Sequence, residues 1–202
     1  MREPPAVGEV RARLPGLEGE RARLREVILA KGLKTQGPYQ LTAGGTSPYL
    51  FDLKPVLLDP EGAVLVGRLG ASLVHQLGAT HVGGREIGAV PIAAVIAQAS
   101  WREGPPLQGF FARKQAKQHG TAKLLEGNVP QDADTVVVED VTTTGGSSMA
   151  VVDELKRTGA RVKGVVTVVD REEGAAKTFA EAGIAFRALL LLRDFPELDR
   201  LR

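Results

Sequence analysis

Cysteine is absent from the 202 residues. Its absence excludes disulfides, thiolate zinc sites and a thiol nucleophile. The longest uncharged, mostly apolar run, Ile87–Ser100, is shorter than the ~20 residues that a membrane-spanning helix needs. The basic N-terminal residues are not followed by the apolar segment of a secretory signal. We therefore expect a cytoplasmic protein with no membrane partner.

Aromatic residues are also scarce, at 4% of the chain, and neither sign of charge dominates. The 26 basic and 24 acidic side chains leave a net charge of +2. A nucleic-acid-binding protein more often has a dense basic stripe with interleaved aromatics, so no nucleic-acid partner is expected. With 43% apolar and 25% charged residues, the composition is typical of a globular domain large enough to need no metal or disulfide for its core.

Strand and helix patterns alternate along most of the chain. Helical spacing of apolar residues predicts helices over 20–31 and 60–78, the second with Val64, Leu65, Leu69, Leu73 and Leu77 on one face. Further helices are predicted over 88–101, 147–158 and 172–182, and strands over 80–82, 107–112, 135–138, 162–169 and 185–192. The strands are rich in β-branched residues and lack polar alternation, which indicates an α/β fold with a mostly parallel sheet covered by helices on both faces.

The turn after the strand at 135–138 carries the most informative motif, VVVEDVTTTGGSS. In parallel sheets, ligands bind outside the carboxyl ends of the strands. Here Glu139 and Asp140 precede a run of hydroxyl side chains and two glycines that let the backbone approach a ligand closely. The free N–H groups at the start of the next helix suit a phosphate. Carboxylates beside a phosphate site suggest a phosphorylated sugar whose diol meets the acids; the alternative is a strand end followed by a well-capped helix.

The same motif resembles the 5-phosphoribosyl 1-pyrophosphate (PRPP) signature of the type I phosphoribosyltransferases. The resemblance implies that Glu139 and Asp140 hold the ribose hydroxyls, with Asp140 also taking part in catalysis. It implies a 5-phosphate loop made of Val141, Thr142, Thr143, Thr144, Gly145, Gly146 and Ser147. It does not specify the base that accepts the sugar.

The chain's one dense basic cluster is Arg113, Lys114, Lys117 and His119. Taken alone, it would be interpreted as a solvated surface loop. Its pattern RKxxKxHG, however, resembles the mobile catalytic loop of orotate phosphoribosyltransferases. The resemblance implies a homodimer in which the loop 113–122 reaches the neighbouring active site, with Lys117 and His119 catalytic and all four side chains binding PRPP.

Two further segments support the same family. The segment 41–60 resembles the family's hood over the orotate ring, which implies orotate contacts from Leu50 and Phe51. Arg171 and Thr143 match orotate-binding positions, although Arg171 without the resemblance would be interpreted as an ordinary solvated base. An arginine fork suits the carboxylate of orotate.

The segment 82–98 resembles the family's second turn, where Gly83 and Gly84 are expected to let the backbone approach the pyrophosphate. Two positions depart from the family. Some members carry a lysine where this chain has Thr42, and some carry one where it has Gly88.

The resemblance implies that orotate and PRPP are converted to orotidine 5′-monophosphate and pyrophosphate. Mg²⁺ is expected as a cofactor held mainly by PRPP and water, with no metal ligands from the protein. The expected organisation is an N-terminal extension over 1–19 and a single phosphoribosyltransferase domain over 20–202, with a hood over 20–55 and a core over 60–192. Two alternatives stay open at this point: a purine phosphoribosyltransferase, and a regulator that senses PRPP while it binds RNA or DNA.

Overall fold

The computed structural model describes residues 10–40, 46–115 and 124–201. Its centre is a six-stranded sheet in the order β10-β9-β8-β5-β6-β7, parallel except for β7, which is antiparallel to β6. The strands are β5 (His81–Arg85), β6 (Gln108–Ala112), β7 (Leu125–Glu126), β8 (Asp134–Thr142), β9 (Arg161–Asp170) and β10 (Phe186–Leu191). The predicted α/β fold with a mostly parallel sheet is confirmed.

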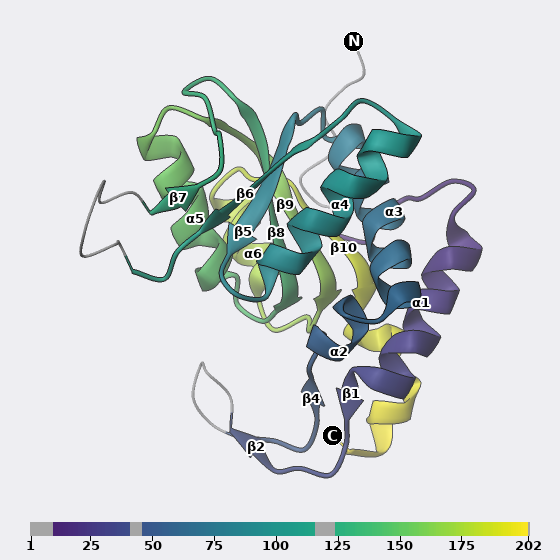
Figure 1. Ribbon diagram of the computed structural model, residues 1–202. Coiled ribbons are helices and arrows are strands. Elements are labelled where there is room, and N and C mark those ends of the chain that lie inside the picture. The colour runs from purple at the N-terminus through teal and green to yellow at the C-terminus, as the bar shows by residue number, and fades with distance from the viewer. Residues whose placement is uncertain (1–9, 41–45, 116–123, 202) are drawn as a thin grey trace.

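Helices cover both faces of this sheet (Figure 1). One face carries α1 (Glu18–Lys31), α3 (Pro60–Gln76) and α4 (Ala89–Glu103). The other carries α5 (Gly146–Arg157) and α6 (Ala175–Glu181). No helix within the described ranges is both long enough and apolar enough to cross a bilayer.

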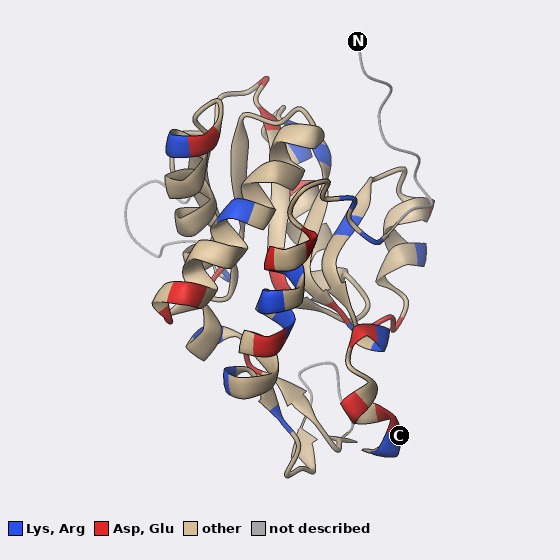
Figure 2. Cartoon of the chain, turned by 90° about the vertical axis from the view of Figure 1, so that its right-hand side faces the viewer, with Lys and Arg blue, Asp and Glu red and all other residues tan. Residues whose placement is uncertain are grey.

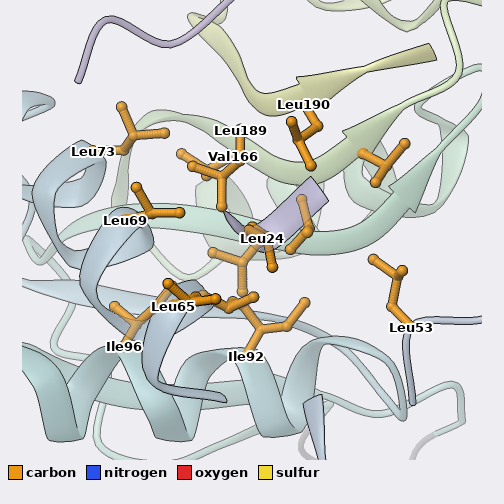
Figure 3. Packing of buried hydrophobic residues seen from close by; sticks show 14 of the residues in the cluster. Leu24, Leu53, Leu65, Leu69, Leu73, Ile92, Ile96, Val166, Leu189 and Leu190 are labelled. Carbon is orange, nitrogen blue, oxygen red and sulfur yellow. The ribbon is translucent and has the colours of Figure 1, made fainter. Parts of the chain in front are cut away.

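The larger core lies between the sheet and the first group of helices (Figure 3). Leu69 and Leu73 of α3 are 0% and 2% exposed, and they face Val166 and Leu189 of the sheet. Burying a leucine fully contributes about 1.5–3 kcal/mol. Val64, expected on the same face, is instead 58% exposed. Consecutive helical residues are ~100° apart, so Val64 lies beside the buried row rather than in it.

A hood lies at the carboxyl ends of the strands (Figure 1). It consists of two short antiparallel pairs and a one-turn helix: β1 (Leu33–Lys34) with β4 (Leu50–Phe51), β2 (Tyr39–Gln40) with β3 (Thr46–Ser47), and α2 (Lys54–Leu57). A hood was expected from the family resemblance, whereas α2 was not predicted. Asp59 then accepts hydrogen bonds from the N–H groups of Glu61 and Gly62, both at 3.1 Å, and so caps α3.

The two ends of the described chain also belong to the folded unit. Ala12 donates its N–H to Ala188 O at 3.0 Å, while Ala188 donates to Val10 O at 2.8 Å, so this segment runs along the edge strand β10. Ala12 and Leu14 are 1% and 2% exposed. The described part of the predicted N-terminal extension therefore contributes to the core. At the other end, Phe195 follows the short 3-10 turn η1 (Leu192–Asp194) and is fully buried.

Candidate active site

A cavity of about 800 Å³ lies between the hood and the carboxyl ends of the strands. Its walls come from the hood, from the turn after β5, and from β8 with the turn that follows it. The lining residues are Gln40, Leu50, Phe51, Lys54, Arg85, Glu86, Ile87, Gly88, Ala89, Lys114, Val138, Glu139, Asp140, Val141, Thr143, Thr144, Gly145, Gly146, Ser147, Ser148, Arg171 and Glu173.

The two acids lie within β8, not in the turn where the sequence suggested them. The strand continues to Thr142 because β9 pairs with it that far, Thr142 opposite Asp170. Glu139 Oε2 accepts a hydrogen bond from the hydroxyl of Ser148 and another from Thr142 Oγ1 at 3.4 Å. Burial raises the pKa of Glu139, the Ser148 hydroxyl opposes that rise, and the negative charge of Asp140 adds to it.

Asp140 has fewer compensating partners. Burial raises the pKa of its carboxyl, and the N–H of Val141, which donates to Asp140 Oδ1 at 3.0 Å, lowers it. The cavity thus holds two adjacent carboxyl groups whose surroundings disfavour charge. Hydroxyl donors from a ligand would stabilise the ionised form of such groups.

The turn after β8 is shaped for an anion. Gly145 has a φ of +84°, and a Cβ there would lie 2.8 Å from Cζ of Phe179, so both backbone conformation and space require glycine. The carbonyl oxygens of Thr143 and Thr144 accept hydrogen bonds from two residues of α6, the N–H of Ala175 at 3.1 Å and the hydroxyl of Thr178 at 2.9 Å. Carbonyl oxygens that faced the cavity would repel a phosphate, but these two are engaged by α6. The N-terminus of α5, which attracts anions, begins at the cavity wall with Gly146.

The glycines of the second turn do not act as expected. A Cβ on Gly83 would lie 2.2 Å from Phe110 O, and one on Gly84 would lie 2.0 Å from Val138 O. Both residues are buried inside β5 and neither lines the cavity. They allow close packing against neighbouring strands, not the approach of a ligand. Gly88 is the glycine at the cavity wall, where a Cβ would lie 2.8 Å from the Asp140 carboxyl group.

Arg171 is not the solvated base that its local sequence would indicate. It is 5% exposed, its guanidinium lies 4.9 Å from the ring centroid of Tyr49, and its Nε donates to Glu173 Oε1 at 2.8 Å. Tyr49 in turn packs edge-on against Phe51, with centroids 5.9 Å apart. A fixed, buried guanidinium therefore faces the cavity below the hood.

Comparison with known proteins identifies the family. No protein-family model matches the sequence. The curated orotate phosphoribosyltransferase of Bradyrhizobium sp. strain BTAi1 is 48% identical over 179 residues, which cover 87% of this chain and 96% of that protein. This chain belongs to the orotate phosphoribosyltransferase family.

Solved structures agree with this assignment to the orotate phosphoribosyltransferases. A structure of the Mycobacterium tuberculosis orotate phosphoribosyltransferase has a TM-score of 0.77 at 36% identity, covering 87% of this chain and 98% of that one. Another structure of the same enzyme, in complex with PRPP, has a TM-score of 0.72 at 32% identity, with the same coverage of both chains.

Most residues that the family resemblance singled out line this one cavity. Those brought together there are Leu50, Phe51, Lys114, Glu139, Asp140, Val141, Thr143, Thr144, Gly145, Gly146, Ser147 and Arg171. Thr142 is 1% exposed and does not line the cavity, but its hydroxyl donates a hydrogen bond to Glu139. Arg113 pairs with Glu126 at 2.9 Å and is not among the lining residues. Lys117, His119 and Thr42 lie outside the described residues.

Sequence reasoning missed four charged residues that line the cavity, Lys54, Arg85, Glu86 and Glu173. Lys54 begins the unexpected helix α2, Arg85 and Glu86 follow Gly84, and Glu173 lies two residues after Arg171. Ser148 is the last residue of the motif VVVEDVTTTGGSS, but the sequence does not predict its hydrogen bond to Glu139. Among the described residues, no group of three or more His, Asp or Glu could hold a metal ion.

Proposed function

We propose that this chain transfers the 5-phosphoribosyl group of PRPP to orotate, releasing pyrophosphate and forming orotidine 5′-monophosphate for pyrimidine nucleotide synthesis. The observation that carries this proposal is the arrangement of one cavity, in which a half-buried acid pair, an anion-binding turn and a buried arginine meet. Each suits one part of the two substrates. Family membership supports the same reaction.

The sugar phosphate fits the β8 side of the cavity. The turn from Thr143 to Ser147 binds the 5-phosphate through backbone N–H groups and hydroxyls at the start of α5. Glu139 and Asp140 accept hydrogen bonds from the ribose hydroxyls, which compensate for the burial that raises the pKa of both carboxyls. The sugar is thereby oriented with its reacting carbon toward the hood.

Orotate fits below the hood. The guanidinium of Arg171 pairs with the orotate carboxylate, and its contact with Tyr49 keeps it in place. Leu50 covers the ring, while Thr143 adds a hydroxyl from the phosphate turn. Phe51 supports the hood from within the core, where it packs on Phe195 at 5.0 Å.

The leaving group needs positive charge and a dry site. Lys114, together with Lys117 and His119 of the basic loop, is assigned to the pyrophosphate, where charge develops as the bond to the sugar breaks. Closure of the loop over the site would exclude water, which would otherwise hydrolyse the sugar cation.

Magnesium is part of the proposal. When bound to PRPP, Mg²⁺ neutralises charge on the pyrophosphate oxygens. In phosphate sites it keeps several waters and takes only one or two carboxylates. The acid pair, Glu139 and Asp140, offers hard oxygen atoms to that water shell, so the site fits an ion held mainly by PRPP and water.

The test of the reaction is ultraviolet detection of orotate consumption with PRPP and Mg²⁺, run beside hypoxanthine, adenine and uracil as competing bases. Turnover of orotate alone supports the proposal. Turnover of a purine would reassign the base, and tight PRPP binding without turnover of any base would indicate a sensor.

Basic and acidic residues are interspersed on the helical face in Figure 2, and nucleic-acid binding that weakens with salt would contradict the enzyme assignment.

We also propose a homodimer whose loop 113–122 completes the neighbouring site, in a cytoplasmic protein. Lys117→Ala and Asp140→Asn should each be nearly inactive, because each removes one half of every site. After the two variants are mixed and reassociated, heterodimers hold one intact site and activity should return. Mixtures that stay inactive would show that the loop serves its own subunit. Fractionation of cells expressing the chain tests the location.

A further inference from the structure

Lys54 is a positively charged side chain in the cavity wall that has no role in the proposed reaction so far. Its Nζ lies 2.7 Å from Asp52 Oδ1, while Asp52 Oδ2 lies 2.9 Å from Nζ of Lys34. Two lysines therefore share one carboxylate, and of the two only Lys54 lines the cavity. Lys34, Lys54 and Asp52 together carry a net charge of +1, and of the two lysines Lys54 is the one at the cavity.

Lys54 and Gly88 approach the same carboxyl group. The positive charge of Lys54 lowers the pKa of Asp140, against the larger effect of burial. On the other wall, a Cβ on Gly88 would lie 2.8 Å from that carboxyl. The charge of Lys54 in α2 therefore acts on the same carboxyl group that Gly88 faces.

Of the other cations in the described cavity wall, Lys114 is already assigned to the pyrophosphate, and Arg85 ends β5. Arg171 is paired with Glu173 and lies on Tyr49, which suits the base. The 5-phosphate is met by the turn after β8. What lies between, beside Asp140 and Gly88, is the place for the group attached to the reacting carbon of the sugar.

We propose that Lys54 binds the pyrophosphate end of PRPP. This inference rests on the proposed function. An ammonium group has three donors; Asp52 takes one, which fixes the side chain, and two are left for phosphate oxygens. Asp52 keeps Lys34 as a second partner, so the carboxylate stays neutralised when Lys54 turns to the ligand.

The test compares Lys54→Ala and Lys54→Arg with Lys34→Ala as the matched control. The control removes the other half of the same ion-pair network but leaves the cavity wall unchanged. In the forward direction the KM of PRPP and of orotate are measured, and in the reverse direction those of pyrophosphate and orotidine 5′-monophosphate. Melting temperatures of all variants establish that each is folded.

Lys54→Ala should raise the KM of PRPP and of pyrophosphate by about tenfold to a hundredfold, the usual effect of losing a charge-assisted hydrogen bond. The KM of orotate and of orotidine 5′-monophosphate should stay within about twofold, as should every constant of Lys34→Ala. Lys54→Arg should recover most of the loss, because the charge is kept.

Two results would overturn the inference while the proposed function stands: an active wild type with unchanged PRPP and pyrophosphate constants in Lys54→Ala, or a rise confined to orotate or orotidine 5′-monophosphate. An inactive wild type would instead remove the proposed function. In that case calorimetric titration of wild type and Lys54→Ala with PRPP decides the role of Lys54: weaker binding to the variant supports it, and equal binding overturns it.

Discussion

Asp140 should destabilise the protein that it serves. Its pKa is raised by burial, which means that the folded state disfavours the charged carboxylate. In the unfolded chain the same group ionises near pH 4. At neutral pH, folding must therefore bury a charge without full compensation. Asp140→Asn keeps the shape of the side chain and an acceptor for the Val141 N–H, but it removes the charge. The variant should have a higher free energy of unfolding than wild type.

The sign of the pH dependence follows from the raised pKa. Below pH 4 the carboxyl is protonated in both states and the two proteins should be similarly stable. As the pH rises through the pKa of the unfolded chain and then that of the folded state, wild type loses stability relative to the variant. Each pKa unit corresponds to about 1.4 kcal/mol, or roughly 3–6 °C in Tm for a domain of this size.

Asp134 provides a control of opposite sign on the same strand. Its carboxyl accepts a hydrogen bond from Arg161 Nε at 2.7 Å, which holds its pKa below the usual range. That contribution to stability is present above pH 4 and is lost as the pH falls. Asp134→Asn should therefore lower the free energy of unfolding at pH 7, and Tm with it, by about 1 kcal/mol or less in free energy, because the pair is partly exposed.

The assay is calorimetric unfolding of wild type and both variants without ligand, from pH 4 to pH 8. Asp140→Asn should gain on wild type across this range, while Asp134→Asn should lose. An Asp140→Asn protein that melts at or below the wild-type temperature at pH 7, with Asp134→Asn behaving as expected, would refute the reasoning. The charge of Asp140 would then be compensated by contacts other than the main-chain N–H groups and Lys54.

Three other substitutions test the local geometry. Gly145→Ala should lower stability by about 1–2 kcal/mol, since φ is +84° and the new Cβ would meet Phe179; denaturant unfolding measures this, and an unchanged midpoint would contradict it. Arg171→Lys should raise the KM of orotate about tenfold or more while the KM of PRPP stays near wild type, because the fork is lost; steady-state kinetics separate the two. Leu14→Ala should cost about 2–4 kcal/mol, since Leu14 is 2% exposed, whereas a residue of a loose extension would cost almost nothing.

The order of elements could be predicted because apolar spacing reports which side of each segment is buried. The end of β8 could not. Glu139, Asp140 and Thr142 are polar, so the apolar pattern stops at Val138, yet β9 continues the hydrogen-bonded pairing through Thr142. Pairing between strands distant in sequence leaves no local signal in either strand. The helix α2 could not be predicted for a different reason: its four residues are too few to show a helical period.

The sequence shows where glycines stand but not what each one packs against, and the expectation for Gly83 and Gly84 differed from the structure for that reason. A glycine shows that some group comes close, but not which group. At Gly83 and Gly84 that group is a neighbouring strand, while at Gly88 it is the Asp140 carboxyl. The sequence pattern was identical in kind, and only the packing of β5 between β6 and β8 separates the two cases.

The charges of the cavity differ in how far the protein itself compensates them. Arg171 has Tyr49 and Glu173, and Glu139 has the hydroxyls of Ser148 and Thr142. Within the described part of the chain, Asp140 accepts hydrogen bonds only from main-chain N–H groups. A buried carboxylate with unused acceptor capacity binds hydroxyl donors more strongly than one that is already satisfied. Asp140, rather than Glu139, is therefore the acid whose environment improves most when a ribose diol arrives.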